Sequence, residues 1–249
     1  MGRIKLIMEY DGSNYHGFQI QKNAHTVQAE LEKAIYRLSD EQVTITCAGR
    51  TDAGVHALGQ VVAFDSGATI PGDKWTPALN SFLPADIQVL ESRQVKDSFN
   101  PRFDAVSKRY IYKIYRRKNG ASIYRNYSLC NTEELDLKAM QEGCGLIEGR
   151  QNFRAFCASG SSAKTFERRV IRCQITEKEP WLCLEIEADG FLYNMVRIIT
   201  GTILQVGRSK YSPEYIKEII SLRDRTLAGP TVPPQGLYLV VVNYPPGVL

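Results

Sequence analysis

The sequence of 249 residues predicts an α+β fold in which antiparallel sheets are flanked by helices. Runs of β-branched and aromatic residues alternate with polar residues at the period of a strand, and several such runs follow one another without an intervening helix. Amphipathic segments with helix-capping residues separate the other runs. This mixture is typical of α+β proteins. With 43% hydrophobic residues, the chain can build the core of one large domain or two medium ones.

Two helices are expected to begin at capping residues. Thr26 is the expected N-cap of a helix over residues 27–38, whose apolar positions fall on one face. Asp136 is expected to cap a second helix over residues 137–148 in the same way. The physical basis is that short polar side chains accept hydrogen bonds from the first N–H groups of a helix.

Two further helices are expected toward the C-terminus. Residues 192–206 are apolar around most of the helical circumference, which predicts a buried helix. Arg197 is the exception on this helix, and a buried arginine is costly unless a carboxylate lies opposite it. Pro213 predicts a helix that runs to about residue 222, because proline fits the first helical position.

The remaining apolar segments have the length and alternation of strands. They are residues 4–10, 43–47, 60–64, 87–95, 108–115, 170–175, 181–188 and 236–244.

A short repeated pattern suggests two related halves. The pattern E-x-D-G-x-x-Y occurs at residues 9–15 and again at 187–193, each time at the end of an expected strand. The irregular segment 99–102 interrupts regular structure between them. We therefore expect an N-terminal lobe over residues 1–105 and a C-terminal lobe over residues 106–249, with an active-site cleft between the halves.

The stretch at residues 48–56 reads AGRTDAGVH and places Asp52 on a loop between two expected strands. Gly49 and Gly54 flank this aspartate and allow the loop to turn sharply. Arg50 adds a planar set of donors and a fixed positive charge, which suits phosphate and keeps a nearby carboxylate ionised. Taken alone, the segment fits a hairpin loop with solvated charges as well as it fits a catalytic site.

The most basic segment is residues 108–118, which read KRYIYKIYRRK and contain no acid. A strand here places Tyr110 on one face and Arg109 on the other. Cations and flat rings on one element suit unpaired RNA, although a half-buried strand with solvated charges is the commoner structure. Arg168 and Arg169 form a second basic group, so we expect these arginines to contribute to an RNA-binding surface.

Composition argues against several classes of protein. Six cysteines and three histidines show no metal-ligand spacing, which predicts reduced thiols and no metal. No segment approaches about eighteen uncharged apolar residues, and the first residues lack a signal-peptide pattern. We therefore expect a soluble cytoplasmic protein without membrane contact. The net charge of +4 is compatible with a nucleic-acid partner but does not require one.

Taken together, these segments resemble the bacterial tRNA pseudouridine synthase A family nearly from end to end. The matching motifs are YDG at 10–12 with GFQ at 17–19, TVQ at 26–28, GRTDAGVH at 49–56, LN at 79–80 with LP at 83–84, RFDA at 102–105, RYIY at 109–112, FLYNMVR at 191–197 and GLYL at 236–239. Asn100 and Pro101 depart from the family pattern, and we expect them to alter the shape of a loop rather than the chemistry.

The resemblance implies two ferredoxin-like, or RRM-like, halves with the pseudouridine synthase fold, a homodimer that binds tRNA, and no cofactor. It implies isomerisation of uridine to pseudouridine in the anticodon stem-loop of tRNAs, at positions thirty-eight to forty. Asp52 would be the catalytic carboxylate, Arg50 would help to flip the target base, and Arg197 would pair with Asp52. Tyr110 would pack on the flipped base, and Leu237 would contact the substrate.

The chemistry of the residues leaves the role of Asp52 open. To break a glycosidic bond and rejoin the sugar to carbon five of uracil, an ionised carboxylate attacks the sugar or the base, or removes a sugar proton. A noncatalytic RNA-binding protein is the alternative, and Asp52 would be incidental in it. An aspartate-dependent phosphotransferase is a weaker alternative, because the chain has no D-x-D pattern and no obvious magnesium cluster.

Overall fold

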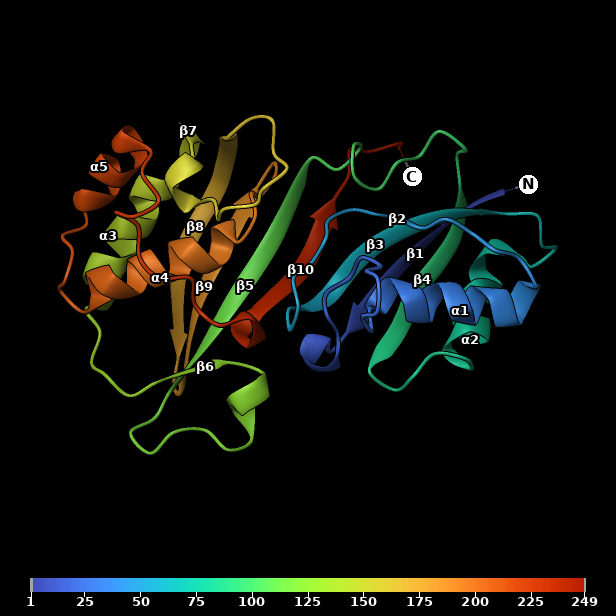
Figure 1. Cartoon of the computed structure of the whole chain (residues 1–249), viewed down its shortest axis with the longest axis horizontal. Coiled ribbons are helices and arrows are strands. Elements are labelled where there is room, and N and C mark those ends of the chain that lie inside the picture. The colour runs from blue at the N-terminus through green and yellow to red at the C-terminus, as the bar shows by residue number, and fades with distance from the viewer. Residues whose placement is uncertain (1, 249) are drawn as a thin grey trace. The chain divides into compact units, whose positions relative to one another are not determined.

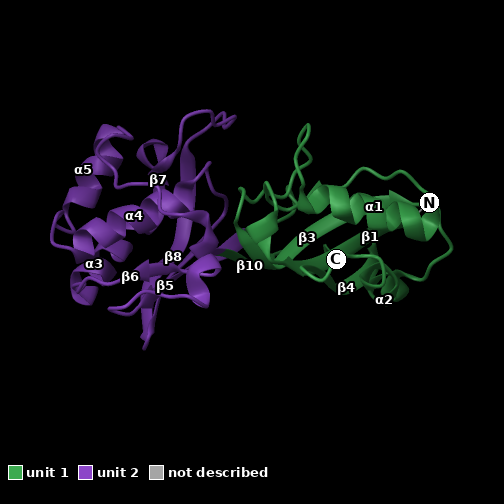
Figure 2. Ribbon diagram, turned by 60° about the horizontal axis from the view of Figure 1, so that its bottom comes forward, with its two compact units in different colours: residues 1–106, 238–249 green, residues 107–237 purple. Residues whose placement is uncertain are grey.

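A computed structural model describes residues 2–248, and the chain forms two compact units (Figure 2). Unit 1 comprises Met1–Val106 and Tyr238–Leu249, and unit 2 comprises Ser107–Leu237. The sequence-based boundary at residue 105 assigned the whole C-terminal part to the second lobe. The structure instead groups the last strand with the first lobe, because Tyr238 and Leu239 pair with His56 and Ala57.

The sheet of unit 1 has the strand order β4-β1-β3-β10. Its strands are β1 (Gly2–Tyr10), β2 (Thr46–Cys47), β3 (His56–Ser66), β4 (Ile87–Val95) and β10 (Leu237–Asn243). β1 is antiparallel to both β3 and β4, and β2 is antiparallel to β3. β10 is parallel to β3, so the sheet is mixed and not wholly antiparallel as expected.

The helices of unit 1 are α1 (Val27–Ser39) and α2 (Trp75–Asn80). α1 lies along the sheet, and α2 contacts both α1 and β4 (Figure 1). Thr26 caps α1 as expected, because its hydroxyl oxygen accepts a hydrogen bond from the N–H of Ala29 at 3.4 Å. The sequence pattern did not indicate α2, whose single buried tryptophan, Trp75, packs edge-on against Phe64 of β3.

The sheet of unit 2 has the strand order β5-β9-β8-β7. Its strands are β5 (Ser107–Arg116), β6 (Leu129–Asn131), β7 (Gly149–Asn152), β8 (Glu167–Lys178) and β9 (Trp181–Ala188). The pairs within that order are antiparallel, and β6 is parallel to β5. β9 alternates between buried and half-buried positions, which is the pattern that made it readable as a strand.

The helices of unit 2 are α3 (Leu137–Ile147), α4 (Met195–Gly207) and α5 (Tyr215–Leu222). α3 contacts β8, and both α4 and α5 pack on α3 (Figure 1). Asp136 caps α3 as expected, since its carboxylate accepts from the N–H of Ala139 at 2.9 Å.

Two helix starts were predicted too early. α4 begins at Met195 rather than at residue 192, because Asn194 adopts a left-handed conformation with φ of 59° and cannot continue a helix backward. α5 begins at Tyr215, so Pro213 precedes the helix rather than occupying its first position. The short 3-10 helices are Gly12–Asn14, Gly72–Lys74, Tyr124–Asn126, Arg154–Phe156 and Pro234–Gly236.

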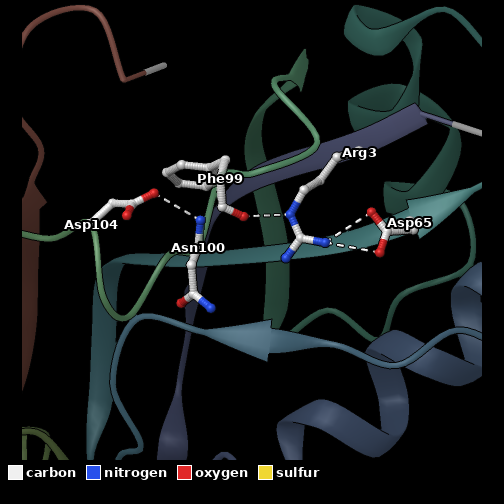
Figure 3. A network of polar contacts seen from close by, with 5 residues as sticks. All are labelled: Arg3, Asp65, Phe99, Asn100 and Asp104. Carbon is white, nitrogen blue, oxygen red and sulfur yellow. Dashed lines mark hydrogen bonds and ion pairs between the residues drawn. The ribbon is translucent and has the colours of Figure 1, made fainter.

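A polar network in unit 1 fixes the loop that carries the unusual Asn100 (Figure 3). Arg3 donates to the carbonyl oxygen of Phe99 at 2.5 Å and to both carboxylate oxygens of Asp65 at 2.8 and 2.9 Å. The N–H of Asn100 donates to Asp104 at 2.9 Å, and the Asn100 side-chain oxygen accepts from the N–H of Arg102 at 2.9 Å. Asn100 therefore closes its own turn.

Among residues 2–248, no helix is both long enough and apolar enough to cross a membrane.

Candidate functional site

Asp52 lies in the loop of residues 48–55, which joins β2 to β3 as the sequence predicted. Arg50 is exposed, Thr51 is buried and Asp52 is partly exposed, so the residue between the two charged side chains anchors the loop in the protein. The N–H of Val55 donates to the carbonyl oxygen of Asp52 at 3.1 Å and closes a turn. Gly54 occupies this turn with φ of 75°, a conformation that favours glycine.

The segment that follows β1 holds the Asp52 loop through backbone hydrogen bonds. The N–H of Phe18 donates to the carbonyl oxygen of Thr51 at 3.0 Å, on the N-terminal side of Asp52. On the other side, the N–H of Gly54 donates to the carbonyl oxygen of Tyr15 at 3.2 Å. Bonds on both sides leave the backbone of Asp52 little freedom.

Two glycines allow the segment after β1 to approach the Asp52 loop closely. A Cβ atom at Gly12 would lie 2.1 Å from the carbonyl oxygen of Val55, and one at Gly17 would lie 2.6 Å from that of Thr51. Gly17 also has φ of 92°, which other residues rarely adopt. The YDG and GFQ motifs therefore owe their glycines to the backbone of the Asp52 loop.

Three buried side chains support the same loop from inside unit 1. The hydroxyl groups of Tyr10 and Thr51 form a hydrogen bond of 2.7 Å. Gln60 donates from Nε2 to the carbonyl oxygen of Gly49 at 2.7 Å. Sequence reasoning missed these residues as part of the site. The available signal was a polar glutamine at the start of the otherwise apolar run 60–64.

His56 supports the segment after β1 from the first position of β3. Its Nδ1 atom lies 3.0 Å from the N–H of Gly12 and 3.1 Å from a carboxylate oxygen of Asp11. The imidazole ring is buried and stacks on Tyr238, with 4.7 Å between ring centroids. The pairing of β10 with β3 thus places the Tyr238 ring against His56, the residue that contacts Asp11 and Gly12.

Tyr110 lies on β5 in unit 2 and is 7% exposed. Its ring packs edge-on against Phe191 at 5.0 Å, just before α4. Tyr112 and Tyr115 are buried as well. The three tyrosines of the basic strand therefore contribute to packing within unit 2, and Tyr112 and Tyr115 do not form an exposed stacking surface.

Arg197 lies on α4, is half-buried and already has partners within unit 2. It donates from Nε to the carbonyl oxygen of Val232 at 2.8 Å and from Nη1 to the side-chain oxygen of Asn194 at 2.7 Å. Burial raises the pKa of the Tyr112 hydroxyl, and the positive charge of Arg197 acts in the opposite direction. The side chain is thus oriented by a backbone carbonyl and an amide.

Leu237 follows a turn that is fitted against Tyr112. The tyrosine hydroxyl donates to the carbonyl oxygen of Pro233 at 2.8 Å. A Cβ atom at Gly236 would lie 2.7 Å from the tyrosine ring, so only glycine allows this approach. Leu237 itself is buried at the start of β10.

The basic residues expected to bind RNA do not form a purely positive surface. Arg109 lies directly opposite Glu187 on β9, and Arg172 on β8 lies opposite the same glutamate. The Nε atom of Arg109 is buried and has no hydrogen-bond partner among the described residues. Arg168 and Arg169 are consecutive on β8, so their side chains leave opposite faces of the sheet.

The expected site residues are divided between the units. Arg50 and Asp52 belong to unit 1, and the others belong to unit 2. Those others are Tyr110, Arg109, Arg168, Arg169, Arg197 and Leu237. Within the part of the chain that the structure describes, no group of three or more histidines, cysteines, aspartates or glutamates is arranged to hold a metal ion.

A family model described as tRNA pseudouridine synthase matches residues 6–104 and 144–245. This match defines the class of protein, an isomerase that forms pseudouridine.

Similar proteins cover the chain almost completely. The tRNA pseudouridine synthase A of Syntrophomonas wolfei subsp. wolfei is 69% identical over 98% of this chain and 98% of its own length. Those of Moorella thermoacetica and of Thermoanaerobacter sp. are 45% and 46% identical over 97% and 98% of this chain, and over 99% and 100% of their own lengths. The chain belongs to the tRNA pseudouridine synthase A family.

Proposed function

We propose that this protein converts uridine to pseudouridine at positions thirty-eight to forty of the anticodon stem-loop of tRNA, with Asp52 as the catalytic carboxylate. Family membership supports the reaction class. The observation that carries the assignment of Asp52 is its loop. A partly exposed carboxylate is held by backbone hydrogen bonds on both sides, next to the exposed Arg50. Such fixed presentation is what a reacting group requires.

The proposed reaction is an isomerisation. The bond between C1′ of the ribose and N1 of uracil breaks, the base turns, and C1′ joins C5. The proton leaves C5, and N1 ends protonated, so atoms and charge balance without a redox partner. Asp52 either forms a covalent bond to the sugar or base, or removes a sugar proton. Both roles require the ionised form of its carboxylate.

The other residues have proposed roles around this step. A uridine in a stem is inaccessible until its base is flipped out. Arg50 is therefore proposed to take part in flipping the base, by occupying the space that the base leaves or by stabilising the flipped conformation. Tyr110 is proposed to pack on the flipped base, and Leu237 to contact it. Arg197 is proposed to pair with Asp52, because an arginine stabilises a carboxylate from which RNA excludes water.

Binding of the tRNA backbone is proposed to involve Arg109, Arg168 and Arg169. The Nε atom of Arg109 has no hydrogen-bond partner among the described residues, which is consistent with a ligand that completes its hydrogen bonds. We further propose that the protein acts in the cytoplasm as a homodimer that binds tRNA and needs no cofactor.

The test is a comparison of tRNA from cells with and without this protein. Pseudouridine is mapped by its chemical modification at single-nucleotide resolution. Loss of pseudouridine at positions thirty-eight to forty, restored by the wild-type gene but not by an Asp52→Asn variant, is the expected result. Loss at other tRNA positions would contradict the proposed specificity, and restoration by Asp52→Asn would contradict the proposed catalytic residue.

A further inference from the structure

We propose that Tyr10, Thr51 and Gln60 form a network that positions Asp52 and Arg50 for the chemical step. This inference rests on the proposed catalytic role of Asp52. The three residues act through the loop backbone and do not touch the substrate. They are positioning residues whose loss slows the reaction more than it weakens tRNA binding.

The fold explains how the three side chains meet. Leu6, Met8 and Tyr10 alternate along β1 and are all buried, so Tyr10 is the last side chain on the core face of this strand. The antiparallel register places Gln60 of β3 opposite Met8, on the same face. Thr51 then brings the loop to this face, because it is buried between exposed and partly exposed neighbours.

The hydrogen bonds hold the loop at two points. Gln60 binds the carbonyl oxygen of Gly49, the residue before Arg50, and Tyr10 binds the hydroxyl of Thr51, the residue before Asp52. Gln60 Nε2 also lies 3.5 Å from the Tyr10 hydroxyl oxygen, which links the two anchors. Each charged residue of the loop therefore directly follows an anchored residue.

Burial makes this network rigid. Tyr10, Thr51 and Gln60 are 4%, 6% and 0% exposed, so their polar atoms have no easy alternative in water. Buried polar groups that lose a partner are strongly disfavoured, and the hydrogen bonds therefore restrict the loop to one arrangement. Burial also raises the pKa of the Tyr10 hydroxyl above its ordinary value, which already lies well above neutral pH.

The expected effect on catalysis follows from geometry. A displacement of about 1 Å at a reacting group lowers the rate by about 100-fold. The carboxylate of Asp52 is one residue away from the anchored hydroxyl, so small rotations of Thr51 reach it directly. Affinity for tRNA depends mainly on phosphate contacts spread over a large surface, and these do not involve the network.

The experiment measures single-turnover tritium release and binding, using a tRNA transcript labelled at C5 of uridine. Tyr10→Phe removes the hydroxyl and keeps the ring that packs near Phe18. Thr51→Val removes the partner hydroxyl, and Thr51→Ser retains it. Tyr244→Phe is the matched control, because Tyr244 lies in the same unit and donates to the carbonyl oxygen of Pro101 at 2.8 Å, an atom that is not part of the Asp52 loop.

We expect Tyr10→Phe and Thr51→Val to lower the single-turnover rate by about 10- to 100-fold, while the Kd for tRNA stays within about twofold. Thr51→Ser and Tyr244→Phe should keep nearly the wild-type rate. The double variant Tyr10→Phe/Thr51→Val should be no slower than either single variant, because both remove the same hydrogen bond. Because each of the two substitutions removes this one bond, additive losses of rate in the double variant would contradict the proposal.

An Asp52→Asn variant, measured beside the others, separates this inference from the proposed function. If Asp52→Asn is inactive and Tyr10→Phe is as fast as Tyr244→Phe, the positioning role is wrong and the catalytic assignment stands. If Asp52→Asn turns over at the wild-type rate, the catalytic assignment fails and the network has no reacting group to position. Should Tyr10→Phe fail to fold, the comparison of Thr51→Val with Thr51→Ser decides: equal rates overturn the proposal.

Discussion

The N–H of Phe18 donates a hydrogen bond of 3.0 Å to the carbonyl oxygen of Thr51, the residue that precedes Asp52. With the bond from Gly54 to Tyr15 on the other side, it holds the loop through main-chain atoms. A substitution of the Asp52 side chain leaves these bonds in place. The fold and the chemistry of this residue can therefore be tested separately.

Asp52→Asn should remove catalysis and preserve the fold. The amide keeps the size of the carboxylate but lacks its charge, so the single-turnover rate should fall by at least about 1,000-fold. Affinity for tRNA should stay equal or rise slightly, because a negative charge near phosphates is removed. Tritium release, a binding assay and a thermal melt on one preparation check this. Appreciable turnover with intact binding would assign the catalytic role to another acid.

Arg197→Ala should impair both turnover and stability. It removes the hydrogen bonds to Val232 and Asn194, and for a half-buried side chain the expected loss is about 1–2 kcal/mol in the free energy of unfolding. Arg197→Lys keeps the charge but cannot reproduce both bonds, so it should recover turnover only in part.

The control for Arg197 is Arg208→Ala, at the C-terminal end of the same helix. Arg208 forms an ion pair with the exposed Glu133, and its loss should leave turnover unchanged. Urea titration measures the free energy of unfolding of each variant, and single-turnover assays measure its rate. Equal turnover in Arg197→Ala and Arg208→Ala would exclude Arg197 from the catalytic step.

Changing Arg109, Arg168 and Arg169 together to glutamine should weaken tRNA binding and reduce its salt dependence. Each lost phosphate contact lowers the slope of log Kd against log salt by about 0.7 to 0.9. A matched control changes the exposed Lys33, Arg37 and Lys74 of unit 1 to glutamine, which removes the same net charge. Indistinguishable slopes for the two triple variants would show that only overall charge matters.

Gly12→Ala should strongly destabilise unit 1. The added methyl group would lie 2.1 Å from the carbonyl oxygen of Val55, and backbone atoms cannot move aside easily. We expect the free energy of unfolding to fall by about 3 kcal/mol, or the variant to fail to fold. Gly145→Ala in α3 is the control, because its methyl group would meet no atom within 4 Å and should stabilise the helix by about 0.5–1 kcal/mol. Urea midpoints compare the variants, and an unaffected Gly12→Ala would contradict the close packing of this loop.

Activity should persist in a chelator. Among the described residues, no three histidines, cysteines, aspartates or glutamates are grouped to hold a metal ion, and the proposed reaction requires only a carboxylate. Turnover is measured in EDTA with a tRNA that was folded beforehand, and tRNA folding is followed separately by its melting curve. Loss of turnover that magnesium restores without any change in tRNA folding would refute this expectation.

Local signals explain which parts of the fold were predictable. β9 has the predicted bounds, because alternation between buried and half-buried positions runs over its whole length. β4 also has the predicted bounds, although its alternation between buried and exposed positions holds only over residues 87–90. The caps of α1 and α3 were recognisable because a single side chain makes each of them. Asn194 was not recognisable as a helix boundary, since its left-handed conformation depends on its surroundings.

The Asp52 loop was found from its glycines and its charge, but its supports were not. Tyr10 and Gln60 looked like ordinary members of apolar strands, and only the register of β1 against β3 brings them to one face. The charge around the basic strand was not readable from its own sequence for a similar reason. Its sequence contains no acid, whereas its neighbour β9 places Glu187 opposite Arg109.

The family, the α+β class and the loop that carries Asp52 could all be predicted from the sequence, because motifs, alternation and glycine spacing are properties of neighbouring residues. Tertiary structure alone decided that β10 joins the first unit, that Tyr112 and Tyr115 are buried, and that Asn194 and Val232 orient Arg197. These facts depend on strand register and on contacts between distant segments. Such contacts arise from the packing of the whole unit and leave no pattern in the local sequence.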